Sequence, residues 1–219
     1  MRVETENHQD ASVTTQTAIA DRRSKIMAWM VIGVITVPML AAYVIFKTGL
    51  GIPTGTVNKG DLILPATSIE SLEISNTENQ VVDWLQTPSA GFKWRLIVVG
   101  DGRCDEICEA QLYKSRQVHK RLADKARRVE RIYLSTSPQI DPAFAELLQS
   151  EYPRMSVGQV DQTAVENLFV ATNQADVSSG EKILVVDQQG YAMMTYAEHH
   201  TGGEMLDDMK RLLKYSYDG

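Results

Sequence analysis

The two cysteines of this chain lie four positions apart in a segment typical of a reactive thiol site. Residues 100–108 read Gly-Asp-Gly-Arg-Cys-Asp-Glu-Ile-Cys, and Cys104 and Cys108 are the only cysteines among the 219 residues. Side chains at i and i+4 of a helix share one face, with Cα atoms about 6 Å apart, which a disulfide can bridge. Two thiolates also suit Cu(I), a soft ion. The spacing therefore predicts a redox pair or a metal site, with a structural disulfide as the alternative.

The surroundings of the pair pull its reactivity in opposite directions. A helix N-terminus favours the thiolate and lowers the thiol pKa. Four nearby carboxylates oppose this effect, namely Asp101, Asp105, Glu106 and Glu109. Only Arg103 is close enough in sequence to offset their charge. We therefore predict a modest nucleophile. A disulfide in so short a loop constrains little of the unfolded chain and would add little stability, which favours a redox or metal role.

The pair lies where a predicted strand passes into a predicted helix. Lys93–Val99, which ends in the apolar run Leu96–Val99, predicts a buried central strand. From Asp105 onward apolar residues recur at helical spacing, with lysines and arginines on the other face. Val129–Ser135 predicts the next strand, and Asp141 followed by Pro142 predicts the start of a helix to about Glu151.

The remaining elements complete an α/β pattern. Two short β-type runs, Leu62–Leu64 and Ile69–Ile74, predict an N-terminal hairpin. A turn over 75–80 and a β-type run at 81–84 follow. We then expect a short strand beginning at Val157 and a helix from its cap Asp161 through Ala171. The chain ends with a hairpin of Ile183–Val186 and Met193–Tyr196 and a last helix to about Tyr215, which opens with a Thr201–Glu204 capping box. This order predicts a thioredoxin-like α/β sandwich with a central mixed sheet.

An apolar segment near the N-terminus predicts a membrane anchor. Ile26–Phe46 has no charged residue and is long enough to cross the ~30 Å hydrocarbon core of a bilayer. Arg22, Arg23 and Lys25 precede it, which predicts a cytoplasmic N-terminus. A cleaved signal peptide is the alternative, but the polar lead and the core are long for one. We expect a disordered tail at 1–25, the anchor at 26–46, a linker at 47–60 and the exported domain at 61–219.

Charge limits the classes of partner. The net charge of −6 argues against nucleic acid as the main partner, because phosphate binding requires a basic surface. A basic run lies on the helix that follows the cysteines and on the segment after it: Lys114, Arg116, Lys120, Arg121, Lys125, Arg127 and Arg128. We expect a solvated helix face, with lipid headgroups or an acidic partner as alternatives.

Residues 56–215 resemble the SCO family of membrane-anchored copper and thiol proteins of cytochrome c oxidase assembly. The family phrase F-G-[YF]-T-x-C-P-D-I-C-P is similar to residues 99–109, which share the cysteine spacing, the glycine and the isoleucine. The segments 93–96, 132–148 and 187–190 resemble the G-K-W-x-L, I-S-V-D-P-x-x-D-T-P-x-x-L and D-x-x-G phrases of the family. The resemblance implies a thioredoxin-like fold, with Cys104 and Cys108 as redox pair and copper ligands.

The departures from the family pattern concern the metal site. Asp105 and Glu109 replace two prolines beside the cysteines. The family's third copper ligand is a histidine eleven residues before the turn glycine, and that count from Gly190 gives Ser179. His199 and His200 lie beyond the hairpin, as displaced copper ligands or as part of a solvated loop. His119 is predicted to be a surface residue and His8 to lie in the tail.

The resemblance implies a protein that assists cytochrome c oxidase assembly by thiol–disulfide reduction or Cu(I) handling. Its expected partners are an oxidase subunit or another assembly factor, and its expected location is a bacterial inner membrane with the domain in the periplasm. Two alternatives remain: a general membrane-tethered thiol–disulfide oxidoreductase, and a non-catalytic thioredoxin-like binding module.

Overall fold

The computed structural model describes residue 27 and residues 29–48, 57–76, 78, 80–81, 93–174 and 176–216. The chain divides into two compact units, Met1–Thr56 and Val57–Gly219. Within the first unit, the helix Trp29–Thr48 is long and apolar enough to cross a membrane. This finding fits the predicted membrane anchor. The predicted tail and residues 49–56 of the predicted linker lie outside the described residues.

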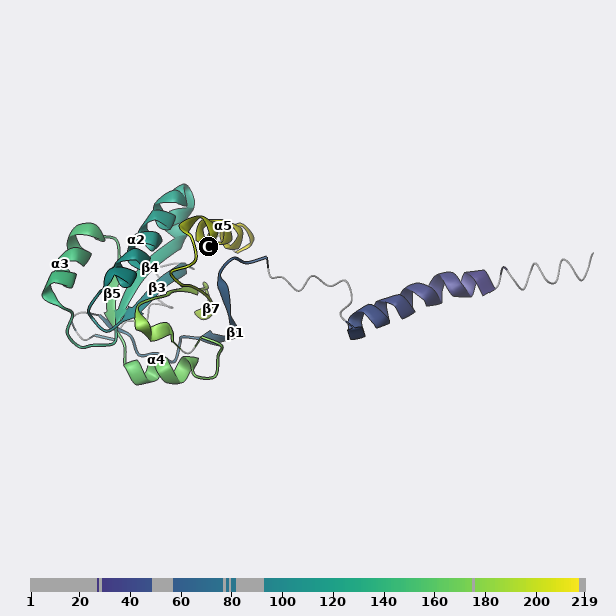
Figure 1. Cartoon of the computed structure of the whole chain (residues 1–219), viewed down its shortest axis with the longest axis horizontal. Helices are drawn as coiled ribbons and strands as arrows, with labels where there is room; N and C mark the ends of the chain where they lie inside the picture. The colour runs from purple at the N-terminus through teal and green to yellow at the C-terminus, as the bar shows by residue number, and fades with distance from the viewer. Residues whose placement is uncertain are drawn as a thin grey trace, which may run out of the picture. The chain divides into compact units, whose positions relative to one another are not determined.

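The second unit is built on a mixed sheet, which has seven strands in the part of the chain that is described (Figure 1). The strand order is β1-β7-β6-β3-β4-β5-β2. Strands β3, β4 and β5 run parallel, while β6, β7 and β1 continue the sheet antiparallel on the other side of β3. The strands are β1 (Asp61–Ser68), β2 (Ser75–Asn76), β3 (Trp94–Gly100), β4 (Val129–Ser135), β5 (Ser156–Gln159), β6 (Ile183–Val186) and β7 (Tyr191–Tyr196).

Strand β3 is central and buried along its whole length, as its apolar sequence predicts. Alternate side chains point to opposite faces of a strand. Leu96 and Val98 therefore join the core under α2, α3 and α5, whereas Ile97 and Val99 join the core under α4. Figure 1 shows α4 on the face of the sheet opposite α2 and α5. The helical elements are α2 (Glu106–Arg121), η1 (Ala123–Arg128), α3 (Pro142–Glu151), α4 (Gln162–Phe169), η2 (Val177–Ser179) and α5 (Gly202–Tyr215).

Local capping signals place the helix starts correctly. Asp105, Asp141 and Asp161 each accept backbone N–H groups of the first turn of α2, α3 and α4. Thr201 and Glu204 form the reciprocal capping box at α5. The predicted thioredoxin-like sandwich with a mixed sheet is confirmed, and the last two strands pair antiparallel. Helix α4 ends at Phe169, two residues before the predicted Ala171.

The predicted N-terminal hairpin is wrong. β1 pairs with β7 and β2 pairs with β5, so these two strands lie at opposite edges of the sheet. Residues 69–74 form a turn rather than a strand, and the Leu72 N–H donates to the Ile69 carbonyl. Ile69 and Ile74 are nevertheless buried. Their apolar spacing reflects a turn that packs two side chains into the core. Of the predicted run at 81–84, only Val81 lies within the described residues, where it bridges to Ser75.

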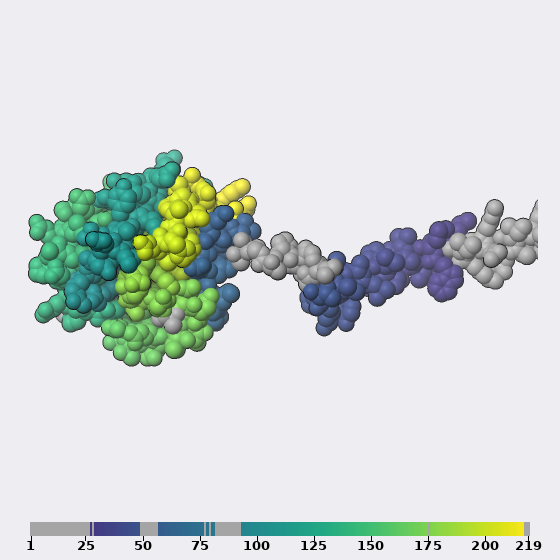
Figure 2. Space-filling model, viewed as in Figure 1, coloured from purple at the N-terminus to yellow at the C-terminus, as the bar shows by residue number. Residues whose placement is uncertain are grey.

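The start of the second unit is held against its last helix. The backbone N–H groups of Lys59 and Gly60 both donate to Asp208 Oδ2 of α5, at 2.7 and 3.1 Å. The Tyr196 hydroxyl donates to the same oxygen at 2.8 Å. Figure 2 shows the yellow C-terminal segment beside the blue segment that begins this unit. Residues 57–60, predicted as part of the linker, are thus ordered by contacts with the domain.

Candidate functional site

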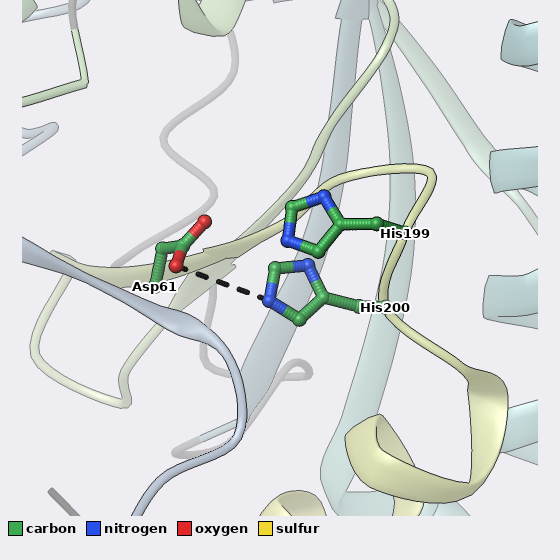
Figure 3. A group of neighbouring side chains, drawn as sticks. All are labelled: Asp61, His199 and His200. Atoms are coloured by element: carbon green, nitrogen blue, oxygen red, sulfur yellow. Dashed lines mark ion pairs between the residues drawn. The ribbon is translucent and has the colours of Figure 1, made fainter. Parts of the chain in front are cut away.

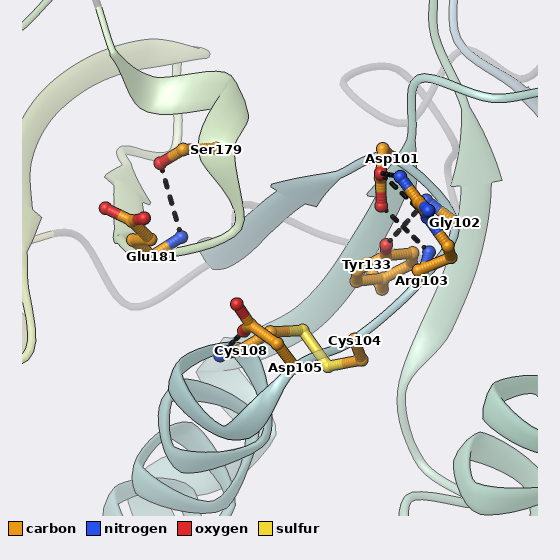
Figure 4. The surroundings of a disulfide bond; sticks show 9 residues. All are labelled: Asp101, Gly102, Arg103, Cys104, Asp105, Cys108, Tyr133, Ser179 and Glu181. Carbon is orange, nitrogen blue, oxygen red and sulfur yellow. Dashed lines mark hydrogen bonds and ion pairs between the residues drawn. A yellow bond between two sulfur atoms is a disulfide. The ribbon is translucent and has the colours of Figure 1, made fainter.

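Cys104 and Cys108 are joined in a disulfide at the junction of β3 and α2 (Figure 4). Their Cα atoms lie 5.2 Å apart. Cys104 precedes the helix cap Asp105, and Cys108 lies in the first turn of α2. The expected closeness of the two sulfurs is therefore found, although only Cys108 is within the helix.

The loop that carries Cys104 is fixed by close backbone packing. Gly102 has φ +83°, and a Cβ at this position would lie 2.6 Å from the Gln139 carbonyl oxygen, so a side chain is excluded. Its N–H donates to Tyr133 Oη at 3.2 Å. Burial raises the pKa of Tyr133 to about 12, so the phenol is neutral at physiological pH. The Gly102 carbonyl accepts the Asp141 N–H, which connects the loop to the start of α3.

The charged residues beside the disulfide are partly neutralised. Arg103 donates from Nε and Nη2 to Asp101 Oδ2, at 3.1 and 2.6 Å. This pairing lowers the pKa of Asp101. Asp105 Oδ1 accepts the Cys108 N–H at 2.9 Å as the helix cap. Glu106 and Glu109 remain exposed, so the surroundings of the pair are net acidic. The modest nucleophilicity inferred from these charges stays a prediction.

The two sulfur-bearing residues differ in exposure. Cys108 is 3% exposed, whereas Cys104 is half-buried. The turn between η2 and β6 covers Cys108: a Cβ on Gly180, which has φ +79°, would lie 3.8 Å from Cys108 Cβ. One helical turn after Cys108, the buried Gln111 donates from Nε2 to the Glu181 carbonyl at 2.8 Å and holds this turn in place. An incoming reactant therefore meets Cys104 first.

The open side of Cys104 faces a groove between the cysteine loop and α3. The groove has a volume of about 360 Å³, and Cys104, Glu109, Phe144 and Leu147 contribute to its lining. Phe144 is buried and packs edge-on against Tyr133, with ring centroids 5.0 Å apart. One wall of the groove is therefore apolar, and Cys104 lines the other.

The turn over Cys108 offers no imidazole at the position where the family resemblance places one. Ser179 Oγ donates to the Asp176 carbonyl at 3.0 Å and accepts the Glu181 N–H at 3.4 Å, within its own turn (Figure 4). Lys182 pairs with Asp176 at 2.7 Å. Once reduced, the cysteine pair would supply two sulfur donors, a set that suits Cu(I) rather than Cu(II).

His199 and His200 lie with Asp61 in a separate cluster (Figure 3). One candidate ligand atom from each residue lies within 4.8 Å of the other two, and the cysteine sulfurs are not part of this group. His200 is 6% exposed, which corrects the expectation of a solvated loop for this residue. Burial lowers the pKa of His200.

Hydrogen bonding sets the tautomer of His200. Its Nδ1 accepts the Ala197 N–H at 3.0 Å, so the proton of the neutral ring is on Nε2, which lies 3.9 Å from Asp61 Oδ1. A histidine that binds a metal normally donates from its other ring nitrogen, the reverse of this arrangement. A cation at Nε2 would require His200 to break its bond to Ala197. A ligand role for His199 and His200 stays a prediction.

His119 and part of the basic run are not the surface groups that were expected. His119 is half-buried, and its Nε2 lies 3.0 Å from the Val129 carbonyl. Lys114 donates to the Ala197 carbonyl, and Arg116 donates to both the carbonyl and the carboxylate of Glu151. These cations satisfy carbonyl groups at the ends of neighbouring elements.

The remaining residues of the basic run include one that is hydrogen-bonded to α5 and four that are exposed to solvent. Arg128 donates to the Leu213 carbonyl and to Ser216, and so holds the end of α5. The exposed cations of the run are Lys120, Arg121, Lys125 and Arg127. The solvated face is thus confined to these four residues.

Several residues around the disulfide were not identified from the sequence. Tyr133, Gln111 and Gly180 contact or support the cysteine segment from other elements. A glycine such as Gly180 before the apolar run of β6 indicates a turn, but no local pattern places that turn over α2. The sequence of α3 has the apolar spacing of an amphipathic helix, but this spacing does not indicate which of its residues line a groove.

Comparisons with known proteins agree with this architecture. The family model described as "Transmembrane-like, thioredoxin-like, C-terminal domain" matches residues 94–216. A comparison with curated protein sequences finds no match.

Among solved structures, yeast Sco1 is 15% identical with a TM-score of 0.52, covering 70% of this chain and 96% of its own. Yeast Sco1 with copper bound is 14% identical with a TM-score of 0.50, covering 74% and 97%. BsSco, described as a Sco family member with a disulfide switch, is 16% identical with a TM-score of 0.51, covering 73% and 99%. At these identities the likeness shows the fold, and it confirms the SCO-like thioredoxin fold expected from the sequence. The chain therefore belongs to the family of transmembrane-like, thioredoxin-like C-terminal domains, with a fold like that of the Sco proteins.

Proposed function

We propose that this protein is a membrane-anchored factor for cytochrome c oxidase assembly that acts through the dithiol of Cys104 and Cys108. The observation that carries the proposal is the disulfide itself: two cysteines joined at a strand–helix junction, with Cys104 open to a groove. Two proteins with a like fold support it, since yeast Sco1 has been solved with copper bound and BsSco has a disulfide switch. A structural disulfide would not need an open side.

The thiol chemistry follows from the unequal exposure. In the oxidised form, a partner thiolate attacks the Cys104 sulfur, and the bond to Cys108 breaks with its electron pair on the Cys108 sulfur. A second partner thiolate then releases Cys104, so the partner gains a disulfide and this protein gains two thiols. The reverse sequence reduces a partner disulfide by two electrons.

Copper would be cargo for the same two residues. Reduced Cys104 and Cys108 would hold Cu(I), which two thiolates suit. The Ser179 hydroxyl is a hard donor held within its own turn, so it contributes nothing to a soft ion. The proposal therefore couples copper handling to the redox state, because the disulfide form has no thiolate to offer.

The proposed location is a bacterial inner membrane with the domain in the periplasm. The helix Trp29–Thr48 supports a single span, and Arg22, Arg23 and Lys25 before it support a cytoplasmic N-terminus. A disulfide persists in an oxidising compartment such as the periplasm.

A cysteine double variant tests the proposal. The full chain, as wild type and as Cys104→Ser with Cys108→Ser, is returned to cells that lack it, and oxidase activity is compared at equal protein level. We expect activity to be restored by the wild type only. Full activity with the double variant would overturn the dithiol role and favour a non-catalytic binding module. Reduction of insulin by the purified chain, without an oxidase defect, would favour the general oxidoreductase.

A further inference from the structure

The structure assigns a docking site to the groove beside Cys104. We propose that it binds an extended, cysteine-bearing segment of a partner protein that carries an apolar residue and a basic residue next to its cysteine. This inference rests on the proposed dithiol function and names the class of substrate on which it acts.

The apolar part of the segment is indicated by the α3 wall. Phe144 and Leu147 lie one helical turn apart and both line the groove. Phe144 is held edge-on by Tyr133, which itself accepts the Gly102 N–H below the cysteine loop. An apolar side chain laid against this wall would bury surface without first ordering the groove, and preorganisation of this kind favours binding.

The basic part is indicated by the charge at the rim. Arg103 lines the groove, but its guanidinium is paired with Asp101 at 2.6 Å. Glu109 is exposed, and its carboxylate has no ion-pair partner within the described part of the chain. Asp141 adds a second carboxylate at the rim while it caps α3. The free charge of the groove is therefore negative, which attracts a cationic segment and repels an acidic one.

The position of Cys104 in the lining of the groove indicates that the bound segment carries a cysteine. Cys104 contributes to the lining, whereas Cys108 is covered by the turn at Gly180. A bound segment would bring its thiolate to the Cys104 sulfur. The new bond joins those two sulfurs, the Cys104–Cys108 bond breaks, and the electron pair stays on Cys108. The proton of the partner thiol passes to solvent.

The test compares a peptide thiol with a small thiol on the same protein. The oxidised full chain in detergent micelles is reduced either by a capped hexapeptide that contains one Cys, one Leu and one Arg, or by 2-mercaptoethanol. The quantity measured is the ratio of the two second-order rate constants. This ratio cancels any change that a variant makes to the intrinsic reactivity of the disulfide.

Two variants test the two features of the groove. We expect Glu109→Gln to lower the ratio by about 2- to 5-fold, the loss of one exposed ion pair, and Leu147→Ser to lower it by about 5-fold, the loss of part of a buried leucine contact. Glu146→Gln is the matched control for the loss of a carboxylate, because Glu146 is exposed on α3, next to Leu147, and does not line the groove. A peptide with Gln in place of Arg should lose its sensitivity to Glu109→Gln, and a peptide with Glu in that place should show a higher ratio in Glu109→Gln, because the variant removes a repulsion.

The outcomes separate the two proposals. Unchanged ratios in both variants, with normal reduction by 2-mercaptoethanol, would overturn the docking site and leave the dithiol function in place. A disulfide that neither thiol reduces in the native protein would overturn the dithiol function itself.

Discussion

Gln111 donates a hydrogen bond from Nε2 to the backbone carbonyl of Glu181, 2.8 Å away, and so ties the helix that carries Cys108 to the turn that covers it. Gln111 is fully buried, and its Oε1 has no hydrogen-bond partner among the described residues. This contact joins α2 to the turn whose Gly180 lies over the buried Cys108.

Replacing Gln111 should therefore expose Cys108. In Gln111→Ala the Glu181 carbonyl loses its partner, and we expect a stability loss of about 1–3 kcal/mol together with a looser turn. In the reduced protein, iodoacetamide should label Cys108 faster relative to Cys104 than in the wild type, as measured by peptide mass spectrometry. Gln117→Ala, on the same helix, is the control. An unchanged labelling ratio would show that the turn does not depend on this bond.

The two glycines with positive φ near the disulfide should differ in their tolerance of a side chain. Gly180→Ala meets only the left-handed backbone penalty of about 1–2 kcal/mol, since its Cβ would have ordinary contacts. Gly102→Ala meets the same penalty and a Cβ placed 2.6 Å from the Gln139 carbonyl. We expect the Gly102 variant to be the less stable of the two in urea unfolding of the full chain. Equal midpoints would contradict the close approach of the loop to residue 139.

Asp208 should be essential for ordering the start of the domain. Asp208→Ala removes the acceptor of the Lys59 and Gly60 N–H groups and of the Tyr196 hydroxyl. We expect a loss of about 2–4 kcal/mol and faster trypsin cleavage after Lys59, because buried donors without acceptors each cost about 1–3 kcal/mol. Tyr196→Phe removes one of the three bonds and should cost about 1 kcal/mol. The prediction fails if the two variants are equally stable and equally resistant to trypsin.

Burial of His119 should make stability depend on pH. Its pKa is lowered in the folded protein because the ring is desolvated, so the unfolded chain binds the proton more readily. The contribution of His119 to stability is therefore complete above about pH 6.5, the unperturbed value, and decreases as the pH falls below it. His119→Gln keeps a side-chain N–H donor and does not titrate, so its free energy of unfolding should fall less between pH 7 and pH 5. Identical pH profiles would place His119 in solvent.

Local signals explain which parts of this structure were predictable. The helix caps Asp105, Asp141, Asp161 and Thr201 act within three residues of themselves, and each helix start was predicted correctly. The apolar run of β3 needed no partner to be recognised as central, because a strand buried on both faces has no polar alternation.

Pairing between distant segments explains the errors. Residues 69–74 have strand-like alternation, but β1 pairs with β7, more than 100 residues away, and leaves them as a turn. His200 was expected in solvent because nothing local shows that its Nδ1 accepts the Ala197 N–H in a buried corner beside Asp61. Likewise the cover of Cys108 comes from Gly180, far along the chain, and only the folded structure brings them together.

The turn over Cys108 also predicts how a third copper ligand could be restored. Ser179 occupies the place that the SCO resemblance assigns to a histidine, and it is exposed on the turn whose next residue, Gly180, lies over Cys108. In Ser179→His, the reduced protein would offer two thiolates and one imidazole, a set that suits Cu(II) better than two thiolates alone. We expect Cu(II) affinity to rise at least about tenfold, equivalent to about 1.4 kcal/mol, with a sulfur-to-copper charge-transfer band that the wild type lacks.

Ser150→His, exposed on α3, controls for a histidine added elsewhere. If both variants bind Cu(II) alike, the turn is too far from the sulfurs to complete a site, and only Cu(I) on the bare cysteine pair remains as cargo.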